Sequence, residues 1–483
     1  MICLALTGRT LEENYSYVQQ YRGSADLFEL RVDTLDTIDP SSIIAFSRFV
    51  DKPMVLTCRR ERDGGCYART DRTRGTLLMK LLEGNFSFLD IEEDFRKYEI
   101  EDQCRKRGIA VIRSIYDTSG TPGDLYSRID SAHHRGEIPK AEVTARSVED
   151  VITVFNADTQ LSHIPRKIII ASGQWGIPTR LLYKRTGSFM TYASPADENA
   201  GAPDHASIES MKNLYRCDRV TGKTKIFGVI GNPVMHTASP RIHNPAFHEL
   251  GIDGIYVPFM VDEMRSFFKL ADILGILGFS VTVPHKQHVL PYLGSITREV
   301  KQIGSCNTVI WERECWKGIN TDYYGFLKPV MDEIEDELIK RCVVIGAGGA
   351  ARSVVWALRN HRCSVTIVNR TAEKAQRLAR ETGSSWVPME ESGSIPEADL
   401  LVQTTSLGME PDTSDALPLY RFTGKERVYE LVYKPKVTPL LSRAMEAGCR
   451  IIYGRQMLIA QGMLQFESFT SREYPFPDDA VVF

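Results

Sequence analysis

The stretch Cys342-Val-Val-Ile-Gly-Ala-Gly-Gly-Ala-Ala351 decides the fold of the second half of the chain. Its apolar start predicts a strand, and the residues from the glycines to Leu358 are typical of a helix. A G-x-G-x-x-A loop between a strand and a helix indicates a dinucleotide-binding Rossmann fold, whereas a plain strand–helix turn is the alternative. Gly346 permits the tight turn, Gly348 lets backbone N–H groups approach a pyrophosphate, and Ala351 permits close helix packing. The cofactor-binding residues expected in this loop are Gly346, Gly348, Gly349, Ala350 and Ala351.

The next strand, predicted at 364–368, indicates which dinucleotide is bound. It ends in Asn369-Arg370-Thr371, where an NAD site would place a carboxylate for the ribose 2′-hydroxyl. An arginine and a hydroxyl suit a 2′-phosphate instead, although Arg370 could also be an ordinary exposed arginine. We therefore predict NADP as the cofactor, with Asn369, Arg370 and Thr371 among its ligands.

Upstream of the glycine loop, four motifs are rich in hydroxyl, amide and charged side chains. They are His236-Thr-Ala-Ser-Pro240, Ser280-Val-Thr-Val-Pro-His-Lys286, Gly304-Ser-Cys-Asn-Thr308 and Asn320-Thr-Asp322. Such side chains suit a polyhydroxylated carboxylate, and a lysine with an aspartate can shuttle a proton. Taken singly, residues such as Thr308 or Asn320 are equally compatible with turns and caps.

Together with the glycine loop, these motifs resemble the shikimate dehydrogenase family over about residues 226–470. Later motifs that share the resemblance are Thr404-Thr-Ser-Leu-Gly-Met409, Tyr433-Lys-Pro435 and Gly454-Arg-Gln-Met-Leu458. The resemblance implies reduction of the ketone of 3-dehydroshikimate with NADPH, with Lys286 as proton donor and Asp322 as its catalytic partner. It implies the substrate ligands Thr237, Ser239, Thr282, Asn307 and Gln461. The departures from the family pattern, which leave the catalytic pair intact, are Thr237, Ser280, Gln403 and Glu430.

The first half of the chain alternates short apolar, β-branched runs with helix-like segments such as 76–84 and 97–107. The runs are 2–7, 27–33, 54–59, 86–93, 110–117, 140–146, 167–173 and 187–194. Eight strands alternating with helices predict a (β/α)8 TIM barrel, and the whole chain is therefore of the α/β class.

Charged residues late in these strands indicate a site at the carboxyl end of the barrel. Glu29, Arg31 and Asp33 alternate along one strand and so share a face, while Arg59 and Lys140 lie at the third and sixth strands. Several charges that converge on a barrel mouth favour an anionic substrate. The alternative is a set of buried ion pairs with a purely structural role.

The motifs of the first half resemble type I 3-dehydroquinate dehydratase over about residues 1–215. They are Glu29-Leu-Arg-Val-Asp33, Thr57-Cys-Arg59, Leu89-Asp-Ile-Glu92, Ile138-Pro-Lys140, and Arg180 after Gly176-Ile-Pro-Thr179. The resemblance implies that Lys140 forms a Schiff base with the substrate ketone and that Arg180 binds the substrate carboxylate. Glu29, Arg31 and Arg59 carry over as further substrate-binding residues. Because the attacking amine must be neutral, we expect the pKa of Lys140 to be lowered, with help from Arg31 and Arg59.

Two departures concern the acid–base chemistry of the barrel. Tyr116 stands where the family has its catalytic histidine, and a phenol is a poor base at neutral pH. Gly201 and His205 replace a serine and a glutamine of the loop that closes the barrel mouth. We hypothesise that His205 partly replaces the missing imidazole. The alternatives are that His205 is a solvated loop residue and that the barrel is catalytically weak.

Composition excludes several classes of protein. The 483 residues carry 59 Lys+Arg against 62 Asp+Glu, so the net charge of −3 provides no basic footprint for nucleic acid. No apolar run approaches the ~18 residues that span a membrane, and the start of the chain lacks the features of a signal peptide. The ten cysteines are scattered without zinc spacing, so we expect no metal, reduced thiols and a cytoplasmic location.

The predicted organisation is a barrel and a two-lobed reductase. The expected limits are 1–215 for the barrel, 216–225 for a linker, 226–325 plus helices at about 455–470 for the substrate-binding domain, 326–454 for the Rossmann domain and 471–483 for a tail. The predicted function is a bifunctional enzyme, a lyase and an oxidoreductase, that converts 3-dehydroquinate to 3-dehydroshikimate and then to shikimate. Its expected partners are small molecules, with no nucleic acid or membrane; the oligomeric state is left open. The alternatives are a quinate/shikimate dehydrogenase with a weakened barrel and, from another class, a metabolite-binding regulator.

Overall fold

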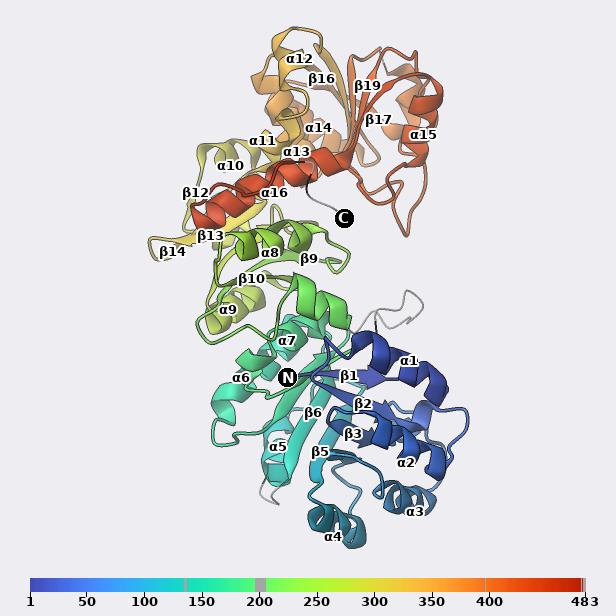
Figure 1. Ribbon diagram of the computed structural model, residues 1–483. Coiled ribbons are helices and arrows are strands. Elements are labelled where there is room, and N and C mark those ends of the chain that lie inside the picture. The colour runs from blue at the N-terminus through green and yellow to red at the C-terminus, as the bar shows by residue number, and fades with distance from the viewer. Residues whose placement is uncertain (134–136, 196–205, 396, 479, 481–483) are drawn as a thin grey trace. The chain divides into compact units, whose positions relative to one another are not determined.

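The computed structural model describes residues 1–133, 137–195, 206–395, 397–478 and 480 (Figure 1). It divides into two compact units. The first comprises Met1–Ile226, Val234–Pro240 and Asp253–Ile276, and the second Phe227–Pro233, Arg241–Ile252 and Leu277–Phe483. The expected linker, 216–225, holds turns and runs into a strand at Lys225. The domain limits stay a prediction.

Eight parallel strands form the sheet of the first unit in the order β7-β6-β5-β4-β3-β2-β1-β8. Their bounds are β1 Ile2–Leu6, β2 Leu27–Arg31, β3 Met54–Thr57, β4 Phe88–Glu92, β5 Ala110–Asp117, β6 Ile138–Thr144, β7 Ile168–Ser172 and β8 Thr191–Ala193. A bridge between Lys167 and Ser188 joins the flanks of β7 and β8, so the sheet is nearly closed. The predicted (β/α)8 barrel is confirmed.

Helices follow the first seven strands of the barrel (Figure 1). They are α1 Leu11–Tyr21, α2 Pro40–Phe49, α3 Asp71–Leu81, α4 Tyr98–Arg107, α5 Leu125–His133, α6 Val148–Gln160 and α7 Ile177–Leu181. Four of them start where a side-chain oxygen accepts a hydrogen bond from the first turn, at Thr10, Asp39, Thr70 and Ser147. Such caps satisfy N–H groups that the helix leaves unpaired, which fixes where each helix begins.

A second, six-stranded sheet has the order β10-β9-β11-β13-β14-β12. Its strands are β9 Lys225–Gly231, β10 Gly254–Met260, β11 Ile276–Val281, β12 Ser295–Ile296, β13 Thr308–Glu312 and β14 Cys315–Ile319. The helices of this part are α8 Ser239–Glu249, α9 Met264–Leu274, α10 Arg298–Ile303 and α11 Asp322–Leu327. The motifs expected to bind substrate lie between β9 and the start of α8, at the end of β11 and the loop after it, and just before β13 and α11.

The third sheet has six parallel strands in the order β17-β16-β15-β18-β19-β20. They are β15 Arg341–Ile345, β16 Ser364–Asn369, β17 Ser385–Pro388, β18 Leu400–Gln403, β19 Arg427–Glu430 and β20 Arg450–Ile452. Counted from β15, the order is 3-2-1-4-5-6, which confirms the predicted Rossmann fold. Its helices are α12 Met331–Glu335, α13 Gly349–Asn360, α14 Ala372–Thr382 and α15 Pro439–Glu446.

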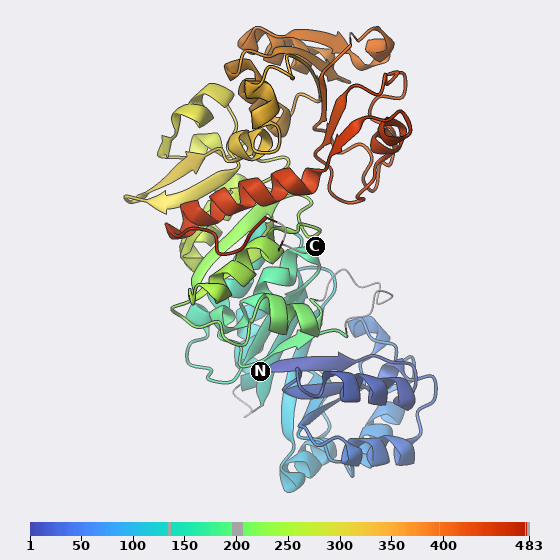
Figure 2. The ribbon, with the colours of Figure 1, turned by 45° about the horizontal axis from the view of Figure 1, so that its top comes forward.

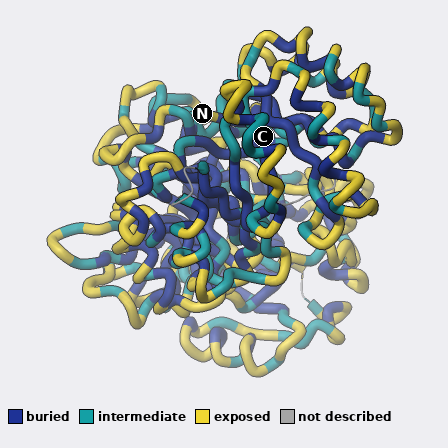
Figure 3. The backbone as a smooth tube through the Cα atoms, turned by 90° about the horizontal axis from the view of Figure 1, so that it is seen from below, coloured by how far each residue is buried: buried dark blue, intermediate teal, exposed yellow. Residues whose placement is uncertain are grey.

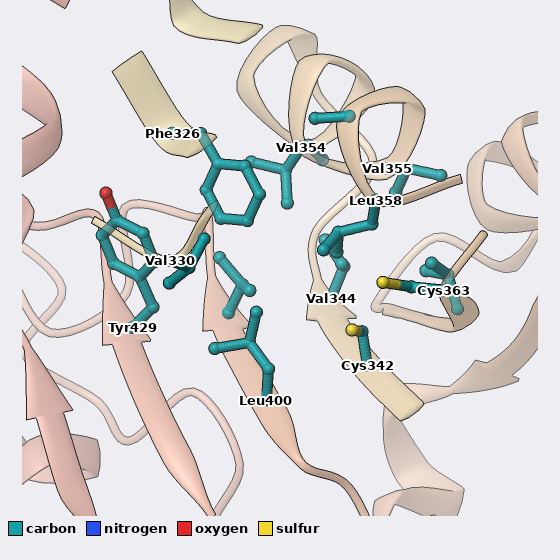
Figure 4. Packing of buried hydrophobic residues seen from close by; sticks show 14 of the residues in the cluster. Phe326, Val330, Cys342, Val344, Val354, Val355, Leu358, Cys363, Leu400 and Tyr429 are labelled. Atoms are coloured by element: carbon teal, nitrogen blue, oxygen red, sulfur yellow. The ribbon is translucent and has the colours of Figure 1, made fainter. Parts of the chain in front are cut away.

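Apolar side chains hold the Rossmann sheet to its helices. Val344 of β15 and Leu400 of β18 face Val354 and Leu358 of α13 in one buried cluster (Figure 4). Phe326 of α11 stacks on Tyr429 of β19, with ring centroids 5.3 Å apart. Among the described residues, exposed positions lie mostly on the outer turns of the backbone tube and buried ones mostly inside it (Figure 3).

The long helix α16, Gly454–Thr470, packs against α11 and against β13 of the second sheet (Figures 1 and 2). Its Gln465 donates to the Asn307 carbonyl at 3.1 Å and accepts from the Ser280 hydroxyl at 2.8 Å. Residues 471–478, the described stretch that follows, contain no helix or strand, but buried Tyr474 anchors them by donating to the Ile242 carbonyl at 3.0 Å.

Glu430, one of the departures from the family pattern, gives a testable dependence of stability on pH. It is fully buried at the end of β19 and accepts from the Val432 N–H at 2.9 Å and the Thr438 hydroxyl at 2.8 Å. Burial raises the pKa of Glu430 to about 7. The unfolded chain loses this proton near pH ~4.3. The folded state is therefore progressively penalised as the pH rises from about 4 to 7, and the penalty is constant above that range.

We expect Glu430→Gln to remove this component of the pH dependence. A pKa change of this size corresponds to about 4 kcal/mol, since each pKa unit is worth ~1.4 kcal/mol. The gain in thermal stability of the variant over the wild type should thus be larger at pH 8 than at pH 5. Thermal unfolding of both proteins across that range checks it, and parallel pH profiles would contradict it.

Candidate active sites

Lys140 lies in the middle of β6 with its side chain fully buried among carboxylates. Its Nζ donates to Asp90 Oδ2 at 2.9 Å, and it lies 4.0 Å from Glu29 Oε1 and 4.0 Å from Glu142 Oε2. Glu29 itself accepts from the Thr57 hydroxyl at 2.8 Å. Parallel pairing of β4, β5 and β6 brings Asp90 and Lys140 together from separate strands. The cluster places one ammonium group against three acids.

The expectation of a lowered pKa for Lys140 is wrong in this structure. Burial lowers it, but Asp90 and the other acidic neighbours outweigh burial and raise the pKa of Lys140 well above its usual value. The arginines expected to oppose this effect are themselves paired with acids. Arg31 forms a fork with Asp33 at 3.0 and 2.7 Å, and Arg59 faces Glu142 at 3.5 Å. Lys140 must therefore give a proton to a neighbour before it can attack a carbonyl.

Arg59 and Arg180 converge on the same acid, Glu142. Arg180 is fully buried, and its Nη2 donates to Glu142 Oε1 at 2.8 Å and to the Ser172 hydroxyl at 3.0 Å. Its Nη1 is buried without a hydrogen-bond partner in the described part of the chain. Because an unsatisfied buried donor is costly, this guanidinium is suited to binding a further anion such as a carboxylate.

Glu142 is the site residue that the sequence reasoning missed. It follows Lys140 by two positions, and strand residues two apart share a face, so the signal was available. Its Oε1 also accepts from the Ser172 hydroxyl at 2.9 Å. In this structure Glu142 takes the position between arginines that a substrate carboxylate would need.

Tyr116 of β5 occupies the place expected for an acid–base group. Its hydroxyl lies 2.9 and 3.0 Å from the two oxygens of Asp90 and accepts from Lys140 Nζ at 3.1 Å. Burial raises the pKa of Tyr116 above its usual value, so the phenol stays protonated and acts as a donor. His205 lies outside the described residues, so its part in catalysis remains a prediction.

Lys286 and Asp322 form the expected pair in the second unit. Lys286 Nζ donates to Asp322 Oδ2 at 2.5 Å, and the side chains are 13% and 6% exposed. Asn307 donates to Asp322 Oδ1 at 2.8 Å and lies 3.2 Å from Gln461 Oε1. Both carboxylate oxygens are therefore held, which fixes the lysine while leaving it partly accessible. The structure thus brings together four of the predicted residues.

The remaining predicted substrate ligands of the reductase lie in loops or, for Ser239, at the first residue of α8. Thr282, just after β11, is half-buried, and its N–H donates to the Ile230 carbonyl at 2.9 Å. Thr237 and Ser239 belong to the segment 234–240 of the first unit, where the Thr237 hydroxyl donates to that of Ser239 at 3.1 Å. Both hydroxyls therefore lie at the entry to α8.

The glycine loop after β15 has the shape that a dinucleotide requires. Gly346 has φ +117, and a Cβ there would lie 2.4 Å from Thr404 Oγ1. A Cβ at Gly349 would lie 2.9 Å from Lys286 Cβ, so the loop packs directly beside the lysine. A Cβ at Gly348 would meet no atom within 4 Å, so the N-terminus of α13 faces open space that suits a pyrophosphate.

The other residues predicted to bind cofactor flank this loop. Ala350 is half-buried and Ala351 fully buried in the first turn of α13. Asn369 ends β16 and donates to the Thr371 carbonyl at 2.8 Å, while Arg370 and Thr371 are exposed. No carboxylate occupies the end of β16, which is where one would repel a 2′-phosphate.

Among the described residues, no group of three or more His, Cys, Asp or Glu side chains could hold a metal ion. No helix in the described part of the chain is both long and apolar enough to cross a bilayer.

Three protein-family models match the chain in succession. The model for type I 3-dehydroquinase matches residues 2–221. The model for the shikimate dehydrogenase substrate-binding domain matches residues 229–309, and the model for shikimate/quinate 5-dehydrogenase matches residues 331–409.

Curated relatives match either the whole chain or its second half. A bifunctional 3-dehydroquinate dehydratase/shikimate dehydrogenase of Arabidopsis thaliana, a chloroplastic protein, is 30% identical over 480 residues, which cover 93% of this chain and 78% of the relative. A shikimate dehydrogenase (NADP(+)) of Shouchella clausii is 38% identical over 259 residues, which cover 52% of this chain and 94% of the relative. A crystal structure of a shikimate dehydrogenase in complex with NADP+ is 34% identical, covers 53% of this chain and 93% of its own, and gives a TM-score of 0.49.

Proposed function

The chain belongs to the family of bifunctional 3-dehydroquinate dehydratases/shikimate dehydrogenases, and from this premise we propose which reaction each of its two sites catalyses. The barrel dehydrates 3-dehydroquinate to 3-dehydroshikimate, and the second half reduces that product to shikimate with NADPH. The chain is thus both a lyase and an oxidoreductase. The observation that carries this assignment is a lysine hydrogen-bonded to a buried aspartate in each half, Lys140 with Asp90 and Lys286 with Asp322.

In the barrel, Lys140 attacks the ring ketone and forms an iminium with loss of water. The iminium withdraws electrons from the neighbouring carbon, whose C–H bond then breaks, and the ring hydroxyl leaves as water. Arg180 and Arg59 bind the substrate carboxylate, which displaces Glu142 from them. Glu29 and Arg31 complete the binding site. Hydrolysis of the iminium then frees the product and Lys140.

In the second half, the residues around Lys286 hold and move one proton. NADPH supplies the hydride, and its pyrophosphate suits the loop from Gly346 to Ala351. Lys286 donates its proton to the ketone oxygen, while Asp322 keeps the ammonium in place and Asn307 orients Asp322. Thr282 and Gln461 bind the hydroxyls and carboxylate of the substrate, and Thr237 and Ser239 are the further substrate ligands that the family pattern implies.

Identification of the product tests the assignment against its alternative. The whole chain is incubated with 3-dehydroquinate and NADPH, and the products are separated by chromatography. Shikimate as the product supports two consecutive reactions. Quinate as the product would mean direct reduction of 3-dehydroquinate and a barrel without dehydratase activity.

We expect the preference of the enzyme for NADPH over NADH to depend on Arg370. A charge-assisted contact to the 2′-phosphate is worth ~1.5–3 kcal/mol, so Arg370→Ala should raise the KM for NADPH by about 10- to 100-fold. The KM for NADH should change little, because NADH lacks that phosphate. Arg380→Ala, which removes an exposed arginine from the far end of α14, serves as the control. Equal effects on the two cofactors would contradict this role.

We also infer a cytoplasmic location and small-molecule partners. All ten cysteines are free, which suits a reducing compartment, and the net charge of −3 suits neither nucleic acid nor an anionic membrane surface. The domain limits expected from the sequence, with the barrel at 1–215 and the Rossmann domain at 326–454, belong to the same proposal.

A further inference from the structure

Three side chains from neighbouring strands of the barrel form a closed triangle of hydrogen bonds. Lys140 Nζ donates to Asp90 at 2.9 Å and to the Tyr116 hydroxyl at 3.1 Å, and that hydroxyl lies 2.9 and 3.0 Å from the Asp90 oxygens. β4, β5 and β6, which carry them, lie in sequence in the sheet. The hydroxyl is thus in contact with both the nitrogen that reacts and the acid beside it.

The surroundings of the triangle fix Tyr116 in one orientation. The guanidinium carbon of Arg59 lies 3.7 Å from the centroid of its ring. The Ser114 hydroxyl donates to Asp90 at 2.7 Å, which holds the carboxylate that Tyr116 faces. Among the described residues, the acids within 4.0 Å of Lys140 Nζ besides Asp90 are Glu29 and Glu142, each 4.0 Å away. A hydroxyl held by an acceptor and a donor can pass protons in either direction.

Formation of a Schiff base requires two protons to move from nitrogen to oxygen. The ammonium of Lys140 carries three protons and the iminium carries one, while the ketone oxygen leaves as water with two. The first proton must leave nitrogen before its lone pair can form the N–C bond. The second must leave nitrogen when the C–O bond breaks and the C=N bond forms.

We propose that Tyr116 is a catalytic residue that carries these protons together with Asp90, an inference that rests on the proposed dehydratase function. Asp90 accepts a proton from Nζ, and the freed lone pair forms the N–C bond while the π electrons of the carbonyl move to oxygen. The Tyr116 hydroxyl gives its proton to that oxygen and regains one from Asp90. The same transfer then protonates the carbinolamine hydroxyl, which leaves as water with the C–O electron pair.

A second tyrosine provides a matched control. The ring centroid of Tyr192 lies 4.1 Å from Lys140 Nζ, and its buried hydroxyl has no hydrogen-bond partner among the described residues. Tyr116→Phe and Tyr192→Phe therefore each remove one hydroxyl and keep one ring beside Nζ. Only Tyr116→Phe removes a hydroxyl that contacts Nζ and Asp90.

The test measures how fast the adduct forms on Lys140. Each variant is mixed with 3-dehydroquinate and quenched with borohydride, and the reduced adduct is quantified by mass spectrometry in H2O and in D2O. Tyr116→Phe should slow adduct formation and turnover by ~10²–10⁴-fold, the range typical of general acid–base groups, and should change the solvent isotope effect. Tyr192→Phe should stay within a few-fold of wild type. Reduction of 3-dehydroshikimate by each variant should be unchanged, which shows that the reductase half is intact.

The outcomes separate this inference from the function on which it rests. If the wild type forms the adduct and Tyr116→Phe forms it at the same rate, the proton-carrying role is overturned and the dehydratase function stands. Equal slowing by the two variants also overturns the role, because it would show a general effect of packing. If the wild type forms no adduct and does not convert 3-dehydroquinate, the dehydratase function and the inference fail together.

Discussion

Lys140→Met is expected to reduce dehydration of 3-dehydroquinate by at least ~10⁴-fold, because it removes the nucleophile itself. Methionine has about the length of the lysine chain and fits the fully buried position. Reduction of 3-dehydroshikimate by the same chain should be unchanged, since Lys140 belongs to the barrel alone. Turnover of both substrates and borohydride trapping of the adduct check this result.

The Lys140→Met variant should also lose stability at neutral pH. Asp90 lies 2.9 Å from Nζ, and removal of the ammonium leaves a buried acid without its counterion. Lys167→Met is the matched control: Lys167 is also buried in the barrel, where Nζ donates to the carbonyls of Leu161 and Ile164. This control should lower the melting temperature yet still form the adduct. An adduct in Lys140→Met would show that another group is the nucleophile.

The strands of the barrel could be predicted well from the sequence, because a buried strand has the pattern of a short apolar run between polar turns. The predicted run 110–117 coincides with β5. The least accurate strand prediction was 187–194, since β8 spans only Thr191–Ala193. Gly187 has φ +70 and ends a short helical turn, so the chain there cannot yet be extended. The end of a helical turn therefore occupies the start of the run that was predicted to be a strand.

The site was harder to predict because it depends on which charges meet. Lys140 and Arg180 could be found from motifs, but that Glu142 pairs with Arg59 and Arg180 depends on the packing of β6 against the segment after β7. For the same reason, the prediction that the pKa of Lys140 is lowered was wrong. The sequence shows the arginines near the site but not that each already faces an acid.

Lys286→Met is expected to lower kcat for reduction of 3-dehydroshikimate by ~10²–10⁴-fold, the range for loss of a general acid. Lys286 Nζ lies 2.5 Å from Asp322 and beside the glycine loop, where a Cβ on Gly349 would touch the lysine Cβ. Methionine preserves the packing against that loop, so the KM for NADPH should change little. Lys317→Met, which removes a half-exposed lysine 2.7 Å from Glu312, is the control and should leave kcat unchanged.

Asp322→Asn separates the proton donor from the group that holds it. The amide is close in size to the carboxylate and can still accept from Asn307, but it no longer offers a negative charge to Lys286. A lysine without its counterion is held less firmly, so kcat should fall less than in Lys286→Met, and the double variant should be no slower than Lys286→Met alone. Additive losses in the double variant would show that Asp322 acts on the substrate independently of Lys286. In all of these variants the dehydration of 3-dehydroquinate should proceed at the wild-type rate, because the residues that perform it lie in the barrel.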